Sequence, residues 1–124
     1  MKAISIRQPF ASLIATGEKT IELRTWYTHY RGPLLICATK SATGLSPEER
    51  LLPRGVAVCI VELVDVLDPV PISSKMSQAA CCELLPGDEF FGWVFASPQL
   101  IQPFPVSGRL GLFDVVVPPT DFPQ

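Results

Sequence analysis

The sequence has little of what a metal centre or a redox site requires. His29 is the only histidine, no Cys-x-x-Cys pair occurs, and two of the four cysteines, Cys81 and Cys82, are adjacent. Protein ligands alone would therefore make a poor zinc site, and we expect neither a metal nor a cofactor. Cys37 and Cys59 lie inside apolar runs and are expected in the core. Because nothing requires an oxidising compartment, we expect a cytoplasmic location.

Long apolar runs are missing as well. The longest extends from Val56 to Val61 and is stopped by Glu62. A helix that spans a membrane needs about 20 apolar residues, so we expect no membrane partner. No continuous apolar segment precedes Arg7, and the sequence therefore predicts no secretory signal peptide.

An overall excess of positive charge is also absent. The net charge of −2 argues against a protein that binds nucleic acid through bulk charge alone. The distribution is uneven, however: residues 1–54 contain eight Lys or Arg and four Asp or Glu, whereas residues 55–124 contain two and eight. A basic cleft in the first part of the chain could attract an anion. Chance scatter of charges in a small protein is the alternative interpretation.

Apolar residues are sufficient for a core, since 48% of the 124 residues are hydrophobic, and we expect a single domain over residues 1–124. Apolar patterns predict strands at 3–7, 19–25, 34–39, 56–67, 90–95 and 110–117, with 100–104 between the last two. Short helices are predicted at 9–17 and 74–84, and Ser46 and Glu49 fit a capping box. Prolines crowd the last third and are expected at edges and corners. The predicted fold class is a β-rich α+β domain.

The most informative segment is residues 17–24. Gly17 fits the position just past a helix end, where a left-handed backbone is favoured. Side chains of a strand alternate between two faces, so Ile21 and Leu23 are expected to point into a core. The opposite face would carry Thr20, Glu22, Arg24 and Trp26. An acid, a base and an indole in a row are typical of the floor of a polar cleft.

This segment resembles a known family signature. Gly17, Lys19, Glu22 and Arg24 fit the pattern G-x-K-x-x-E-x-R of the activating-signal-cointegrator homology (ASCH) family. Residues 5–11, SIRQPFA, are similar to the family's S-x-R-Q-P-[FYW]-A opening, and residues 26–28 and 31–32 resemble its cointegrator branch. Residues 92–95 and 103–112 are similar to the closing strands of bacterial members. The resemblance implies the PUA-like fold (named after pseudouridine synthase and archaeosine transglycosylase), a small mixed β-barrel with two or three short helices.

Three charged residues of the signature are candidates for contact with a ligand. Glu22 and Arg24 lie about 7 Å apart on one strand face, close enough for their side chains to pair. The pair is either a structural ion pair or a guanidinium presented to a phosphate or carboxylate. Lys19 at the strand start could anchor a phosphate, or it is a solvated lysine; as a catalytic base it would need burial or cationic neighbours.

Two flanking segments add further candidates. Arg7 and Gln8 precede a helix start, where open N–H groups favour anions; Gln8 either reads a base edge or caps the turn. The loop after the motif strand contains Trp26, Tyr27 and Arg31. Aromatic side chains interleaved with cations are typical of proteins that stack unpaired bases. Packing of Trp26 and one tyrosine in the core is the alternative.

Three functions fit these residues. We favour a module that binds RNA or single-stranded nucleic acid, or a nucleotide-like ligand, in a basic, aromatic-lined cleft. The resemblance also implies a hydrolase acting on RNA or on a modified nucleoside, because some relatives deacetylate N4-acetylcytidine with a K-x-x-T pattern. Here Glu22 stands at the threonine position, so Lys19 and Glu22 are candidate catalytic residues only if the protein is an enzyme acting through water. The third function is a coactivator-like domain that binds a protein partner.

Overall fold

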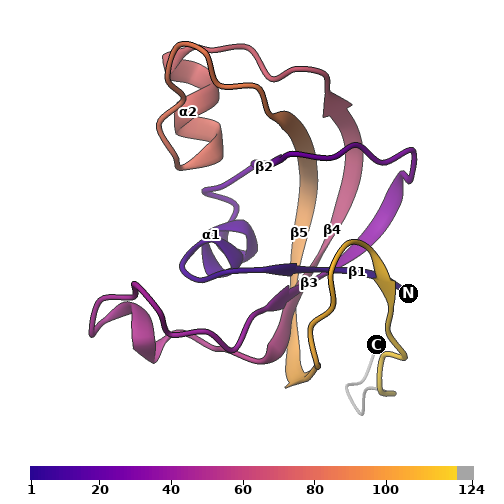
Figure 1. Cartoon of the computed structure of the whole chain (residues 1–124). Helices are drawn as coiled ribbons and strands as arrows, with labels where there is room; N and C mark the ends of the chain where they lie inside the picture. The colour runs from indigo at the N-terminus through magenta and orange to yellow at the C-terminus, as the bar shows by residue number, and fades with distance from the viewer. Residues whose placement is uncertain (120–124) are drawn as a thin grey trace.

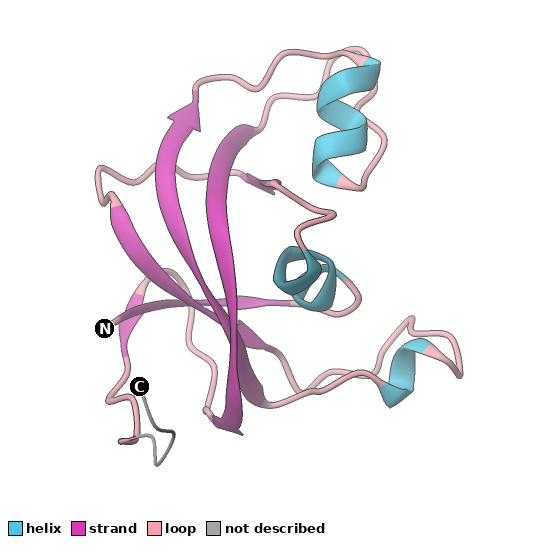
Figure 2. Cartoon of the chain, turned by 180° about the vertical axis from the view of Figure 1, so that it is seen from behind, coloured by secondary structure: helices cyan, strands magenta, loops and turns pink. Residues whose placement is uncertain are grey.

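The computed structural model describes residues 1–119. Its six strands form one mixed sheet in the order β2-β5-β4-β3-β1-β6 (Figure 1). The strands are β1 (Lys2–Ile6), β2 (Ile21–Arg24), β3 (Gly32–Ala38), β4 (Val56–Leu67), β5 (Phe91–Pro105) and β6 (Phe113–Asp114). Helices α1 (Phe10–Thr16) and α2 (Ser74–Ala80) lie on the same side of the long strands (Figure 2), and η1 (Glu49–Leu51) is a single 3-10 turn. Neither helix of this part of the chain is long and apolar enough to span a bilayer.

The sheet curls strongly without closing. Strands β2 and β1 are separated by three other strands in the sheet order. Nevertheless, the Arg24 guanidinium on β2 lies 2.8 Å from the backbone oxygen of Ser5 on β1. Within residues 1–119, β2 and β6 remain the two sheet edges. The strand-rich α+β class is confirmed, and the predicted barrel is an open, curled sheet in which one side chain bridges the gap.

Apolar residues form a cluster on each side of the sheet. Ile4 and Ile6 belong to the main cluster with Trp93 and the buried face of α1, whereas Ala3 belongs to the second cluster with Leu35. This division follows from the alternation of side chains along β1. Trp93 is completely buried. The main cluster therefore fills the inside of the curl.

Local signals in the sequence predict the short elements well. Gly17 adopts φ 85° directly after α1, and its N–H donates to the Ile14 carbonyl. Ser46 and Glu49 form the predicted capping box, with bonds of 3.1 and 2.9 Å, although only η1 follows it. Helix α2 ends earlier than predicted, because Cys81 adopts a left-handed conformation at φ 52°.

The last third of the chain differs most from the prediction. Strand β5 is continuous over fifteen residues and contains Pro98, Pro103 and Pro105. Strand β2 pairs only with Phe91–Val94, so the rest of β5 has β4 on one side and an open edge on the other. Proline is tolerated at such an edge because its missing N–H is not needed there. Strand β6 has only two residues, which pair with Lys2 and Ala3.

The cysteines divide into two buried and two more accessible thiols. Burial raises the pKa of Cys37 to about 11 and that of Cys59 to about 12, with Cys37 adding to the effect on Cys59. Cys82 is exposed. At about pH 8 we expect a thiol reagent to label Cys82 in the folded protein and to reach Cys37 and Cys59 only after unfolding, since the thiolate is the nucleophile. Mass spectrometry of the labelled peptides tests this, and rapid native labelling of Cys59 would contradict it.

Candidate functional site

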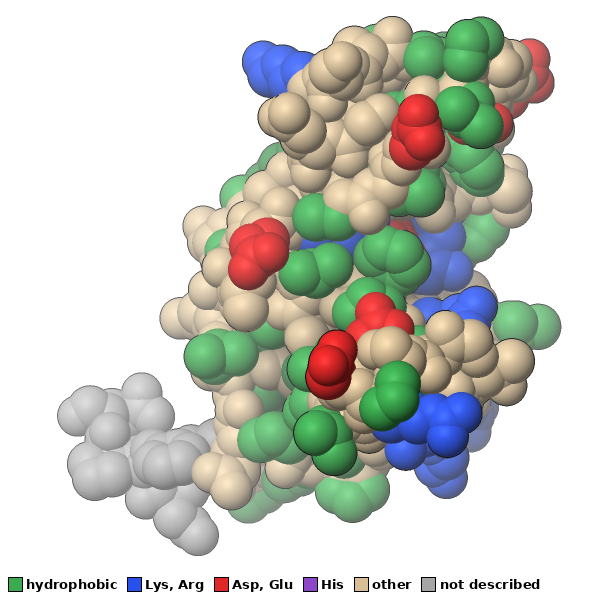
Figure 3. Space-filling model, turned by 90° about the vertical axis from the view of Figure 1, so that its left-hand side faces the viewer, with side chains coloured by type: hydrophobic (Ala, Val, Ile, Leu, Met, Phe, Trp, Pro, Cys, Tyr) green, Lys and Arg blue, Asp and Glu red, His purple; other side chains and the backbone are tan. Residues whose placement is uncertain are grey.

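Residues of β1 and β2 meet at a hollow of about 340 Å³ beside α1. Its lining residues come from β1 and the turn after it, from α1, from Lys19 and strand β2, and from the segment after α2. They are Ser5, Ile6, Arg7, Phe10, Lys19, Glu22, Leu23, Arg24, Cys82, Glu83 and Phe90. In Figure 3, Lys and Arg side chains lie recessed between hydrophobic side chains, below the part of the molecule that carries α2. The hollow therefore combines an apolar wall with a charged floor.

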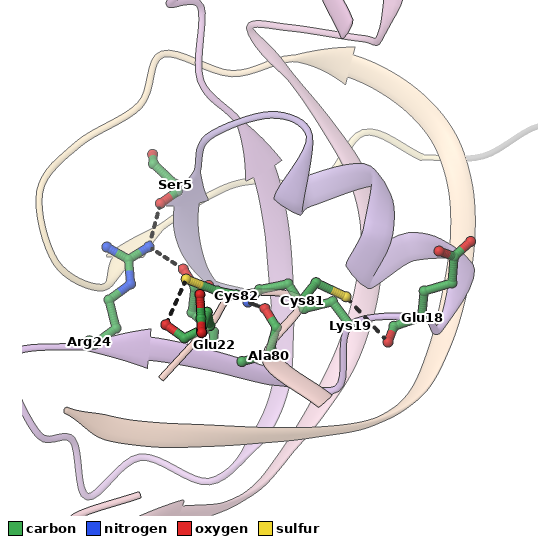
Figure 4. A network of polar contacts seen from close by, with 9 residues as sticks. Ser5, Glu18, Lys19, Glu22, Arg24, Ala80, Cys81 and Cys82 are labelled. Atoms are coloured by element: carbon green, nitrogen blue, oxygen red, sulfur yellow. Dashed lines mark hydrogen bonds and ion pairs between the residues drawn. The ribbon is translucent and has the colours of Figure 1, made fainter. Parts of the chain in front are cut away.

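Glu22 is the centre of the charged floor. Its Oε1 lies 3.4 Å from Lys19 Nζ, and its Oε2 lies 3.1 Å from Arg24 Nη2. Lys19 also donates a hydrogen bond to the backbone oxygen of Ala80, and Arg24 donates to that of Ser5 (Figure 4). The network thus joins β2 to the end of α2 and to β1. Two cations share one carboxylate, which leaves the floor with a net positive charge.

Two of these three charged side chains are buried. Lys19 is 3% exposed and Glu22 is 9% exposed. Buried charges persist only when they are paired and hydrogen-bonded, as both are here. The Lys19 ammonium also lies 5.0 Å from the centre of the Phe10 ring, at cation–π distance. Arg24 is less buried, and its Nε has no acceptor among residues 1–119. The guanidinium therefore has a donor that the described part of the chain does not use.

The sheet geometry explains why the polar residues face the hollow. Glu22 pairs directly with Trp93 of β5, so both side chains lie on the core face of the sheet. The polar network therefore lies at the edge of the main apolar cluster and is continuous with it. Ile21 is buried as predicted, whereas Leu23 is only half-buried and lines the hollow.

Four of the eight predicted ligand residues come together here: Arg7, Lys19, Glu22 and Arg24. Arg7 is exposed at the rim, where its Nη2 donates to the Thr43 carbonyl at 2.6 Å. That bond ties the rim to the segment between β3 and β4. All three cations come from residues 1–54, where the sequence concentrates positive charge.

Gln8 lies outside this lining and is 2% exposed. Its Nε2 donates to the Pro53 carbonyl at 2.7 Å and to Ser12 Oγ at 2.9 Å, and its Oε1 accepts from the Ser12 N–H. The amide is thereby fully engaged with the chain itself. It holds the start of α1 against the segment before β4, which corresponds to the capping alternative.

Replacing Gln8 with alanine is expected to lower the free energy of unfolding by about 2 kcal/mol, because it removes three hydrogen bonds of a buried amide and leaves the Pro53 carbonyl and the Ser12 N–H without this partner. Chemical denaturation measures the loss. Gln78→Ala, an exposed amide on α2, is the matched control and should change stability by less than about 0.5 kcal/mol. Equal stability of the two variants would contradict the structural role of Gln8.

The aromatic loop does not reach the hollow. Trp26 packs edge-on against Trp93 with ring centres 4.7 Å apart, as the core alternative predicted. Tyr27 is 38% exposed, and the Arg31 guanidinium lies 5.7 Å from its ring centre. Arg31 also donates to the Tyr27 hydroxyl and to the Thr28 and Tyr30 carbonyls. Tyr27 and Arg31 therefore form a separate local cluster.

Sequence reasoning missed the aromatic and sulfur-bearing walls of the hollow. Phe10 and Phe90 line it, and so does Cys82, although these residues are far apart in the chain. Phe10 stands within the SIRQPFA segment, and this position was the one available signal. Phe90 and Cys82 could be placed only once the segment after α2 was known to fold over β2. In residues 1–119, no group of three His, Cys, Asp or Glu side chains could hold a metal ion.

Comparison with known proteins now decides the family. The model of the ASCH domain family matches residues 4–105. The chain belongs to the ASCH family. Activating signal cointegrator 1 of Mus musculus is 33% identical over 123 residues, and its Homo sapiens counterpart is 34% identical over 129 residues. Each match covers 86% of this chain and 21% of the relative, so the chain spans about a fifth of the length of these relatives.

Solved structures agree on the ASCH fold. The crystal structure of ASCH from Zymomonas mobilis matches with a TM-score of 0.68 at 17% identity, covering 90% of this chain and 85% of that chain. Two mutant forms of the same bacterial protein match with TM-scores of 0.67 and 0.62. At this low identity the likeness concerns the fold. The PUA-like architecture expected from the sequence is thus confirmed.

Proposed function

We propose that this ASCH domain binds single-stranded RNA, or another single-stranded nucleic acid, with one nucleotide in the hollow beside α1. The observation that carries the proposal is the floor of two cations and one carboxylate beneath aromatic walls. A volume of about 340 Å³ suits a nucleotide-sized group and is far too small for a folded partner.

Each wall has a distinct part in this proposal. Arg24 and Arg7 hold phosphate, since guanidinium groups match phosphate oxygens with paired hydrogen bonds. Phe10 and Phe90 offer their rings to a base, because stacking on aromatic side chains is the common way of holding unpaired bases. Lys19 keeps Glu22 in place, and in this proposal the Glu22 carboxylate accepts a hydrogen bond from a base amino group. Gln8 fixes the start of α1 through its bonds to Ser12 and Pro53.

Tyr27 and Arg31 supply a second contact outside the hollow. The ring is partly exposed and its hydroxyl and face are fixed by Arg31. A fixed aromatic ring costs little entropy to bind and accepts any base. Trp26 supports this loop from the core side through its contact with Trp93.

The geometry favours binding over hydrolysis. The Lys19 ammonium is already engaged by Ala80 and Glu22, which leaves it poorly suited to act as a base. Among the described residues that line the hollow, Ser5 is the sole bearer of a hydroxyl, and Figure 4 shows that hydroxyl pointing away from Arg24. The hollow also contains the Cys82 thiol, which donates to the Glu83 carbonyl and makes no hydrogen bond with Lys19 or Glu22 in the described residues.

The test is a paired assay of binding and turnover. Fluorescence anisotropy with a labelled RNA octamer of mixed sequence, at two salt concentrations, should show binding that weakens as salt rises. Mass spectrometry of the octamer and of N4-acetylcytidine after incubation should show no product. Cut RNA or lost acetyl groups would replace the binding proposal with the hydrolase, and Lys19 and Glu22 would become its catalytic candidates.

A coactivator-like domain is the second candidate. Leu100, Leu110 and Val116 in the last third are 77%, 99% and 93% exposed, which gives a protein partner apolar contacts. The relatives that match by sequence are called activating signal cointegrators. This candidate gains support if the octamer fails to bind at low salt while the folded domain is retained by a protein partner through these three side chains.

A further inference from the structure

A second hollow lies next to the first one, and the two share Ser5. It has a volume of about 500 Å³, and Thr39, Lys40, Gly108 and Arg109 contribute to its lining. Strand β6 pairs only with Lys2 and Ala3, so it leaves the Ser5 end of β1 open. In Figure 4 the Ser5 carbonyl faces Arg24 while the hydroxyl points away from it. The open end of β1 therefore stands between the two hollows.

Two buried hydroxyl groups at this place have no partner. Ser5 Oγ and Thr39 Oγ1 are both inaccessible and make no hydrogen bond within residues 1–119. Leaving a buried polar group unpaired is costly, so such groups are uncommon unless a ligand or water completes them. A Cβ atom at Gly108 would lie 2.7 Å from Ser5 Oγ. Only glycine therefore lets the backbone approach this hydroxyl so closely.

The cations of the second hollow are uncommitted. Neither Lys40 Nζ nor the Arg109 guanidinium has a hydrogen bond or an ion pair with any residue from 1 to 119, whereas Arg7, Arg24 and Arg54 all donate to backbone carbonyls. No acidic residue belongs to its lining. The backbone of Lys40 is held in place by Arg54, which donates to its carbonyl at 2.8 Å. Two cationic residues and two residues with unpaired hydroxyl groups thus line one hollow.

We propose that the second hollow holds a phosphodiester of the same strand whose neighbouring nucleotide occupies the first hollow. Lys40 and Arg109 neutralise the phosphate, and the Ser5 and Thr39 hydroxyls complete its hydrogen bonds, as hydroxyl and guanidinium groups commonly do at phosphates. The strand crosses the open end of β1 between the two hollows. This inference rests on the proposed function and adds that the ligand is a polymer and not a free nucleotide.

The inference is tested by comparing how variants bind a long and a short ligand. The ligands are a mixed-sequence RNA octamer and the four nucleoside monophosphates. Arg109→Gln and Lys40→Gln should each weaken octamer binding about tenfold, the loss of one charge-assisted bond, and change monophosphate binding less than about twofold. The slope of the logarithm of the octamer binding constant against the logarithm of the salt concentration should become less steep by about 0.7 per lost phosphate contact. Lys75→Gln, an exposed lysine on α2, is the matched control and should leave both ligands unaffected.

The outcomes separate the two proposals. If the octamer binds and Arg24→Ala weakens it, while Arg109→Gln and Lys75→Gln behave alike, the second hollow is overturned and the first stands. Equal losses for the octamer and the monophosphates also overturn it, because both would then use one place. If the wild-type protein binds no octamer at low salt, both proposals fail.

A variant that changes neither charge nor side-chain volume gives an independent check. Thr39→Val removes an unpaired buried hydroxyl at nearly constant volume, so Tm should rise while octamer affinity falls about threefold. The opposite signs of the two changes exclude general damage to the fold. Unchanged octamer affinity with a raised Tm would overturn the assignment of this hydroxyl to the phosphate.

Discussion

Replacing Glu22 with glutamine is expected to lower the free energy of unfolding by about 3 kcal/mol, because breaking a buried ion pair leaves an uncompensated charge. Here two cations lose the carboxylate that they share. Lys19 cannot turn to water, since its side chain is 2% exposed and is enclosed by Phe10 and the end of α2. The amide oxygen of glutamine keeps the shape of the site without its charge.

Equilibrium unfolding in urea measures this loss, and Glu18→Gln is its matched control. Glu18 is an exposed acid one position before Lys19, and its carboxylate makes no ion pair with residues 1–119. The control should change stability by less than about 0.5 kcal/mol. Adding Lys19→Met to Glu22→Gln should restore part of the stability, because one of the two orphaned charges is then removed. Additive losses in the double variant would refute the coupling between Lys19 and Glu22.

Replacing Arg24 with alanine is expected to weaken binding of a single-stranded RNA octamer at least about tenfold and to flatten its dependence on salt. Arg24 is the partly exposed cation of the floor, and its Nε has no acceptor among residues 1–119. Fluorescence anisotropy at two salt concentrations provides both quantities.

The control for this result is Lys75→Ala, which removes the same charge from the exposed surface of α2. Arg24 also bridges β2 to β1, so the thermal unfolding of both variants must be compared. The binding measurement is made at a temperature where the Arg24 variant remains folded. Unchanged affinity in a folded Arg24→Ala variant would remove the hollow beside α1 from the binding site.

The sequence predicts well what depends on neighbouring residues. Gly17 ends α1 because a glycine accommodates the left-handed conformation found there, and Ser46 and Glu49 form their capping box because both partners lie within one turn. Alternation along β2 places Glu22 and Arg24 on one face, and their side chains do pair at 3.1 Å. The structure shows the ion pair of Arg24 with Glu22, while contact of Arg24 with a ligand stays a prediction.

What the sequence could not predict depends on the curl of the sheet. Lys19 donates to Ala80, which lies 61 positions away, and Arg24 reaches Ser5 only because β2 folds back towards β1. The same curl brings Phe90 to the hollow and keeps the Tyr27 loop away from it. The prolines of β5 lie along its open edge, as predicted, but the sequence did not show that one strand runs through all of them, central at its start and an edge further on.

The proposed binding site for single-stranded nucleic acid is the hollow beside α1. The most direct measurement is an NMR titration of the 15N-labelled protein with a mixed-sequence RNA octamer at low salt. Backbone amides of residues 5–10, 19–24 and 82–90 are expected to shift most, with smaller shifts around Thr39 and Gly108 from the second hollow. The absence of shifts at low salt, or shifts concentrated on the exposed face of α2 while residues 19–24 stay unchanged, would contradict this expectation.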